Sequence, residues 1–108
     1  LVGDVRDRTA IIVDDMIDTA GTLQKAAQAV ADNGATAVYA VTTHAVLSGP
    51  AVERIENSVL KRVIVTDTIP LGAEAAASSR IQVVPMGRVF AEAIRSIHSN
   101  DSVSRLFR

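Results

Sequence analysis

Three carboxylates lie close together near the N-terminus, at Asp14, Asp15 and Asp18. Neighbouring carboxylates repel one another, so a sequence seldom groups them without something positive or hydrogen-donating nearby. A divalent metal ion could be bound through their oxygens, or a sugar could donate its hydroxyl hydrogens to them. The group therefore predicts a site for a metal ion or for a polyhydroxylated ligand.

The residues that follow favour a different ligand chemistry. Thr19, Ala20, Gly21 and Thr22 offer two hydroxyl groups, a glycine and free backbone N–H groups where a helix is expected to begin. Unpaired N–H groups and the helix dipole together make such a position suitable for a phosphate. The segment is neither a Walker P-loop nor a GxGxxG nucleotide loop. Acceptors for hydroxyls beside donors for a phosphate predict a sugar phosphate ligand.

Spacing alone leaves a simpler interpretation open. Asp18 or Thr19 could cap the following helix, which is a common role for both residue types. Asp14 and Asp15 could then be no more than the solvated end of a strand. Both interpretations stand until the positions of these side chains are known.

The elements around the segment are predicted from hydrophobic patterning. Residues 9–13 form a continuous apolar run, which predicts a strand covered on both faces that stops at Asp14. A loop is expected through Gly21, followed by a helix from Thr22 with apolar residues at helical spacing. Asn33 and Gly34 are expected to end this helix, because glycine tolerates the left-handed conformation.

The remaining chain alternates in the same way. Further strands are predicted at 37–42, 62–66 and 81–84. Further helices are predicted at 87–99 and after the start signal Ser48-Gly49-Pro50, with Pro50 in the first helical position and the end near Asn57. Residues 69–80 are expected to be a surface connection, and Ser102 to cap a short last turn. This order predicts an α/β fold, a mostly parallel sheet flanked by helices, in a single domain of residues 1–108.

Composition excludes several classes of function. The 108 residues suit one small domain, and 3% aromatic content does not suit a stacking platform for single-stranded nucleic acid. A net charge of −1 argues against nucleic-acid or membrane partners, and the sequence has no apolar run of about 18 residues. The absence of cysteine excludes disulfides and is compatible with the cytoplasm.

Several segments carry a resemblance to a known family. Val13-Asp14-Asp15-Met16-Ile17-Asp18-Thr19-Ala20-Gly21-Thr22 resembles the phosphoribosyl-diphosphate (PRPP) signature of the type I phosphoribosyltransferase fold. With Ala20 before Gly21, it is most similar to the ribose-phosphate diphosphokinase (PRPP synthetase) family. The resemblance covers essentially the whole chain and extends to Gly3-Asp4-Val5-Arg6-Asp7-Arg8, Thr43-His44, Ser48-Gly49-Pro50-Ala51, Val65-Thr66-Asp67-Thr68-Ile69-Pro70 and Ser102-Val103-Ser104-Arg105-Leu106-Phe107.

The resemblance implies synthesis of PRPP and AMP from ATP and ribose 5-phosphate, with Mg²⁺. It places Asp14 and Asp15 at the ribose hydroxyls, Asp14 being the better candidate for direct contact. The loop that grips the 5-phosphate then consists of Asp18, Thr19, Ala20, Gly21 and Thr22. The family's catalytic residues and metal-binding residues are expected upstream, so this segment is assigned neither catalytic residues nor a metal ligand.

Other residues have weaker expectations. Ser102, Ser104 and Phe107 match a family segment associated with an allosteric nucleotide or phosphate site between subunits, although helix capping and core packing explain them equally well. His44 is expected to be a hydrogen-bonded structural histidine, because no second histidine or carboxylate shows metal-ligand spacing with it. His98 is expected at the surface.

The resemblance also bears on the organisation of the protein. The chain starts at Leu1 without methionine and is expected to be the C-terminal half of a longer, cytoplasmic enzyme that forms a homo-oligomer of the hexamer type. Alone, it is expected to bind ribose 5-phosphate weakly or not at all and to be inactive. The alternatives are a type I phosphoribosyltransferase, a non-catalytic regulatory relative of the synthetases, and a phosphoacceptor signalling domain, for which Asp67 fits poorly.

Overall fold

Parallel strands and their crossover helices organise the molecule, as the alternating pattern predicts. The structure is a computed structural model that describes residues 3–99. Within them the chain forms one four-stranded sheet in the order β1-β2-β3-β4, all neighbours parallel. The strands are β1 (Thr9–Ile17), β2 (Ala37–Ala45), β3 (Leu60–Thr66) and β4 (Ile81–Val84), and the helices are α1 (Gly21–Asp32), α2 (Ala51–Glu56), α3 (Ala73–Ala77) and α4 (Gly87–His98).

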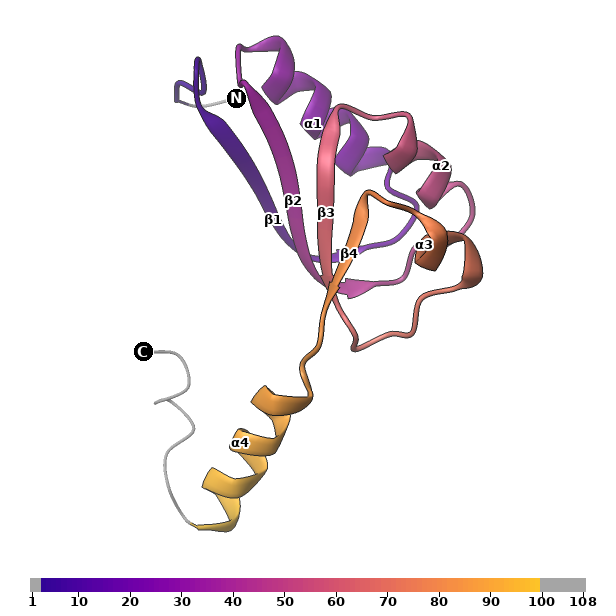
Figure 1. The fold of residues 1–108 in the computed structure, drawn as a ribbon. Coiled ribbons are helices and arrows are strands. Elements are labelled where there is room, and N and C mark those ends of the chain that lie inside the picture. Colours follow the sequence, from indigo (N-terminus) through magenta and orange to yellow (C-terminus); the bar gives the residue numbers. More distant parts are fainter. Residues whose placement is uncertain (1–2, 100–108) are drawn as a thin grey trace.

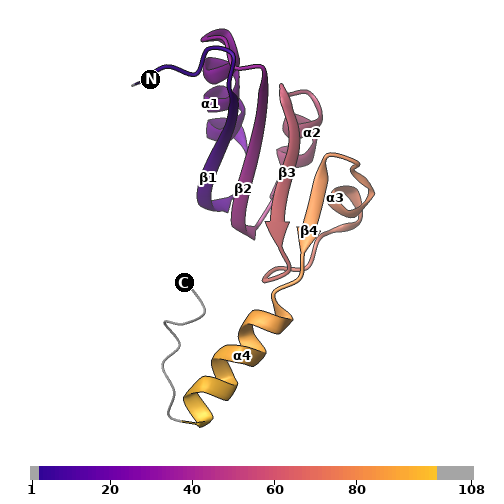
Figure 2. The same cartoon turned by 60° about the vertical axis from the view of Figure 1, so that its left-hand side comes forward.

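The helices α1, α2 and α3 all lie on the same face of the sheet (Figures 1 and 2). Each connects two adjacent parallel strands, and the strand order advances in one direction across the sheet. Successive right-handed crossovers that advance in one direction place their helices on one side. The core is therefore a single layer between the sheet and these helices, and its fully buried large side chains include Ile55, Leu60, Val63 and Val65.

The prediction that the first strand is covered on both faces is wrong for the described residues. Val13 is 75% exposed and Ile11 is 60% exposed, because both point to the face that carries no helix. The continuous apolar run of β1 therefore packs against the core only through alternate, partly buried residues, among them Ile12. The topology explains the difference, since the three crossovers leave the second face open.

Helix α4 extends away from the sheet beyond β4 (Figure 1). Its apolar residues Val89, Phe90, Ile94 and Ile97 share one side, as their spacing predicts, but all four are exposed. No helix in the described part of the chain has the length and apolar character needed to cross a membrane.

Two other expectations need correction. The connection 69–80 contains the short helix α3, whose alanines favour helical geometry strongly enough to form one turn after Gly72. Helix α2 spans Ala51–Glu56, with Pro50 as the capping residue before the first helical position, so it is about one residue shorter than predicted at each end.

Candidate functional site

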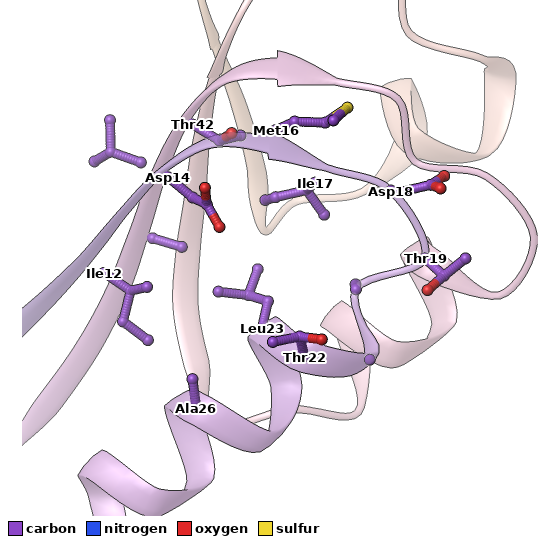
Figure 3. Close-up of a pocket in the computed structure, with 14 residues that line it drawn as sticks. Ile12, Asp14, Met16, Ile17, Asp18, Thr19, Thr22, Leu23, Ala26 and Thr42 are labelled. Atoms are coloured by element: carbon purple, nitrogen blue, oxygen red, sulfur yellow. The ribbon is translucent and has the colours of Figure 1, made fainter. Parts of the chain in front are cut away.

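A cavity of about 310 Å³ lies between the carboxyl-terminal end of β1 and the first turn of α1. Figure 3 shows the side chains that line it, with β1 on one side and α1 on the other. In open parallel sheets this edge is where ligands usually bind. The residues 14–22 predicted from the sequence therefore surround a real cavity, with the exception of Asp15.

Asp14 and Asp15 belong to a strand and not to a loop. The sequence predicts that the strand stops at these residues, but β1 continues through Ile17 because its pairing with β2 extends to Ala45. Successive side chains of a strand point to opposite faces. Asp14 accordingly lines the cavity, whereas Asp15 does not, and its backbone N–H donates to Asp14 Oδ1 at 2.8 Å. The structure thus separates the two carboxylates that the sequence places side by side.

Asp18 holds the loop in place through a hydrogen bond to another loop. Ser48 Oγ donates to Asp18 Oδ1, and Ser48 N–H donates to the Asp18 carbonyl at 3.0 Å. Figure 3 shows the Asp18 side chain at the rim, pointing away from the cavity. The segment after β2 therefore fixes the position of Asp18, where the cavity loop begins.

The first turn of α1 has unpaired backbone donors. No side chain within residues 3–99 caps this helix, so the structure rules out the alternative interpretation in which Asp18 or Thr19 is its cap. The first backbone bond of the helix runs from Gln24 N–H to the Ala20 carbonyl at 2.9 Å. Helix geometry leaves the preceding N–H groups without intrahelical acceptors, and the helix dipole favours an anion beside them. Thr22 and Gly21 line the cavity at this end.

Ala20 adopts a backbone conformation that costs energy for a residue with a side chain. Its φ is +65° and its ψ is 8°, in the left-handed region, and its methyl group is buried. Such a conformation persists only where the surrounding contacts hold it, and it is commonly found at functional sites. Here the turn directs the chain from the end of β1 into α1.

The charges around the cavity bear on whether a metal ion could be held. Asp14 and Asp18 are the acidic residues that line it, and their carboxylates point in different directions. In the described part of the chain, no group of three histidine, aspartate or glutamate side chains could hold a metal ion. The residues at this cavity fit a phosphorylated, hydroxyl-bearing ligand better than a metal ion bound by protein alone.

Sequence reasoning missed two residues at this site. Thr42 is the register partner of Asp14 on β2, lines the cavity, is 2% exposed, and has no hydrogen-bond partner for Oγ1 among residues 3–99. Arg54 of α2 donates from Nη1 to the Thr19 carbonyl at 3.1 Å. Neither contact can be read from local sequence, because strand register brings Thr42 to the cavity and a crossover brings Arg54.

His44 is hydrogen-bonded, as predicted. Its Nδ1 lies 2.8 Å from Thr68 Oγ1, and the Thr66 hydroxyl donates to the Thr43 carbonyl at 2.6 Å. These contacts join the carboxyl-terminal ends of β2 and β3. His98 is exposed on α4, also as predicted.

The candidate allosteric residues Ser102, Ser104 and Phe107 lie outside the described residues. Their assignment therefore stays a prediction from the sequence.

Comparisons with known proteins agree with the resemblance. Residues 1–108 match the family model described as the phosphoribosyl synthetase-associated domain. The chain is 53% identical over 107 residues to the ribose-phosphate pyrophosphokinase of Caldanaerobacter subterraneus subsp. tengcongensis, covering 99% of this chain and 34% of that protein. It is 54% identical to ribose-phosphate pyrophosphokinase 2 of Schizosaccharomyces pombe, again over 99% of this chain and 33% of the relative.

A solved structure is similar as well. The crystal structure of phosphoribosylpyrophosphate synthetase from Mycobacterium smegmatis matches with a TM-score of 0.85 and 37% sequence identity, covering 92% of this chain and 33% of that one. The α/β fold predicted from the sequence is confirmed. The chain spans about a third of the length of the relatives it matches. With the family model matching its full length, this chain belongs to the ribose-phosphate pyrophosphokinase (PRPP synthetase) family.

Proposed function

We propose that the chain provides the ribose 5-phosphate and PRPP site of a ribose-phosphate pyrophosphokinase. One observation carries the proposal: a single cavity joins the Asp14 carboxylate to the uncapped first turn of α1. Asp14 accepts hydrogen bonds from the ribose hydroxyls, and the residues Asp18, Thr19, Ala20, Gly21 and Thr22 form the loop around the 5-phosphate. The relatives carry the name of this activity, which supports the assignment.

In the proposed reaction, the 1-hydroxyl oxygen of ribose 5-phosphate attacks the β-phosphorus of ATP. The new C1–O–P bond forms as the bond from the β-phosphorus to the oxygen bridging to the α-phosphorus breaks. The diphosphoryl group is transferred, AMP leaves, and the hydroxyl proton is released. Phosphoryl transfer of this kind depends on positioning and charge stabilisation more than on a protein nucleophile. The loop holds the acceptor sugar still, and we assign no catalytic residue to this segment.

Asp15 occupies a different place in this proposal. Its backbone N–H donates to Asp14 Oδ1, and its side chain points to the open face of the sheet. This bond orients the Asp14 carboxylate toward the cavity. We therefore propose that Asp15 contributes less to ribose binding than Asp14.

The resemblance implies Mg²⁺ together with ATP. The described residues do not form a metal site of three acidic or histidine ligands, so we assign the ion to no residue of this chain and derive no step through it. For the whole protein we propose a cytoplasmic homo-oligomer in which Ser102, Ser104 and Phe107 contribute to a regulatory site. Sedimentation of the full-length protein, with and without nucleotide, tests the assembly.

A hybrid enzyme tests the proposed function. The present chain replaces the corresponding third of the Caldanaerobacter relative, and formation of AMP and PRPP is measured with ATP and ribose 5-phosphate. We expect turnover by the hybrid and none by the 108-residue chain alone, which should bind ribose 5-phosphate only at millimolar concentration. A folded hybrid without turnover would favour a non-catalytic relative instead. PRPP formation by the 108-residue chain alone would contradict the proposal that this segment binds ribose 5-phosphate but contains no catalytic residue.

A further inference from the structure

Arg54 contacts the cavity loop from behind. Its Nη1 donates to the Thr19 carbonyl at 3.1 Å, and the same nitrogen lies 3.0 Å from the position that a Cβ on Gly21 would occupy. The guanidinium group therefore binds the turn that leads into α1 at Thr19 and fills the space that a side chain at position 21 would enter. Within residues 3–99, no other arginine or lysine side chain is recorded as hydrogen-bonded to this loop.

The helix that carries Arg54 is firmly placed. Ala51, Val52 and Ile55 of α2 are buried in the core, and the Arg54 N–H donates to the Pro50 carbonyl at 2.9 Å. The Arg54 side chain is half-buried where α2 lies beside α1. A side chain extended from such a rigid element can fix the group it contacts more precisely than a free surface side chain.

The contact determines which way a peptide group points. In a trans peptide the carbonyl and the following N–H point in opposite directions. Because the Thr19 carbonyl points toward Arg54, the N–H of Ala20 must point away from α2. Ala20 is also the residue in the left-handed conformation, which alanine seldom adopts. The hydrogen bond from Arg54 to the Thr19 carbonyl fixes the preceding peptide group and so helps to hold Ala20 in this conformation.

Charge gives Arg54 a second effect. The ionisable side chains that line the cavity are Asp14 and Asp18, both acidic, and a phosphate would add further negative charge. A guanidinium group behind the loop offsets part of this repulsion without touching the ligand. The effect is strongest where solvent is excluded, and a half-buried arginine meets that condition in part.

We propose that Arg54 is a positioning residue for the phosphate loop: it orients the Thr19–Ala20 peptide and supplies positive charge behind it. The proposal rests on the proposed function, because it assumes that the loop binds the phosphate of ribose 5-phosphate. The proposal also explains why position 21 is a glycine. The backbone of Gly21 does not require a positive φ, but any side chain there would press on the guanidinium group.

The test uses the 108-residue chain with ¹⁵N labelling and titration with ribose 5-phosphate or inorganic phosphate. In the unsubstituted chain we expect the amide signals of Ala20, Gly21 and Thr22 to move at millimolar ligand. Arg54→Met should raise the dissociation constant by about tenfold, the loss expected for one charge-assisted hydrogen bond. Arg54→Lys, which retains the charge but not the planar fork, should give an intermediate value.

Arg62→Met is the matched control. Arg62 Nη1 also donates to a loop carbonyl, that of Ser79, at 2.9 Å, but this contact lies at the opposite edge of the structure from the cavity. It should change ligand affinity by less than about twofold, as expected for a surface substitution away from the site. Equal affinity of Arg54→Met and the unsubstituted chain would overturn the proposal, as would an equal loss in Arg62→Met.

A ligand-free measurement separates the two proposals. Chemical shifts report the backbone conformation of Ala20, which should leave the left-handed region in Arg54→Met and keep it in Arg62→Met. If the loop signals move with neither ligand, in the unsubstituted chain and in the hybrid enzyme alike, the proposed function fails. An unchanged Ala20 conformation in Arg54→Met would overturn the positioning role even then.

Discussion

Asp14 of β1 and Thr42 of β2 are register partners whose side chains line the same cavity, one carboxylate and one buried hydroxyl. They are 28 positions apart in sequence, and the right-handed crossover through α1 brings them together. Asp15 follows Asp14 directly but points to the other face of the sheet. Register, and not proximity in sequence, therefore decides which polar groups share the cavity.

This relationship predicts unequal roles for the two neighbouring carboxylates. In the hybrid enzyme, Asp14→Asn should raise the KM for ribose 5-phosphate by about tenfold or more, because it weakens charge-assisted bonds to the ribose hydroxyls. The matched substitution Asp15→Asn should have a clearly smaller effect. The KM for ATP should change by less than about twofold in both. Steady-state kinetics with each substrate varied measures both values. Equal losses for the two substrates would contradict the assigned role of Asp14.

The buried hydroxyl of Thr42 leads to a prediction about stability. Its Oγ1 is desolvated without a hydrogen-bond partner among the described residues, so Thr42→Val replaces an unsatisfied polar group with a methyl of similar size. The free energy of unfolding should rise by about 1 kcal/mol. Thr36→Val is the control, because the exposed Thr36 Oγ1 donates to the Arg8 carbonyl at 3.2 Å and its loss should not stabilise the chain. Urea unfolding measures both. A fall in stability for Thr42→Val would show that the hydroxyl has a partner, such as a bound water.

Much of the fold follows from the sequence pattern because the strands and helices are regular. β4 has the predicted bounds, and α1 and α4 differ from prediction by one residue at an end. The bounds of β1 could not be predicted, because the charged residues after Val13 resemble a loop and only the pairing with β2 keeps them extended. The sequence pattern does not predict the short helix α3, because five residues show too little periodicity for a helix to be identified.

The candidate site was predictable only where it is continuous in sequence. Asp14 and the segment from Asp18 to Thr22 could be proposed from residue types alone. Identifying Thr42 as a site residue requires the strand register, and identifying Arg54 requires the position of α2 against the loop. Asp18 accepts a hydrogen bond from Ser48 and does not cap the helix, and this role likewise depends on a contact between distant segments.

Core side chains are buried whereas the apolar side chains of α4 are exposed. Truncating them to alanine should therefore change the free energy of unfolding by very different amounts. Leu60 is fully buried, so Leu60→Ala should lower the free energy of unfolding by about 2–5 kcal/mol. Ile94 is 67% exposed on α4, and Ile94→Ala should change it by less than about 0.5 kcal/mol in the same chain. Denaturant unfolding followed by circular dichroism compares them. A cost for Ile94→Ala similar to that of Leu60→Ala would show that α4 packs against the core in solution.

Gly34 ends α1 in a conformation that only glycine adopts easily. Its φ is +102°, and a Cβ would lie 3.2 Å from Arg6 Cγ and 3.3 Å from Arg6 Cα. Gly34→Ala should therefore lower the free energy of unfolding by about 1–3 kcal/mol. Gly72→Ala is the control, because its φ of −68° suits alanine and no atom lies within 4 Å of the added Cβ. Thermal unfolding of the two variants compares them, and a loss of similar size in Gly72→Ala would remove the conformational explanation.

The contact between Gly21 and Arg54 can be tested as a coupled pair. Gly21→Ala places a methyl group 3.0 Å from Arg54 Nη1, and because that nitrogen is the end of a flexible side chain, it can move by a few tenths of an ångström. Overall stability should therefore change little, while the bond to the Thr19 carbonyl lengthens and ribose 5-phosphate affinity falls by about threefold. In an Arg54→Met background the guanidinium group is gone, so Gly21→Ala should cause no further loss of affinity. Titrations of the two single variants and the double variant give the coupling between the residues. Additive losses of affinity would show that the methyl group introduced by Gly21→Ala acts on the ligand directly. They would also show that the alignment of the loop does not depend on Arg54.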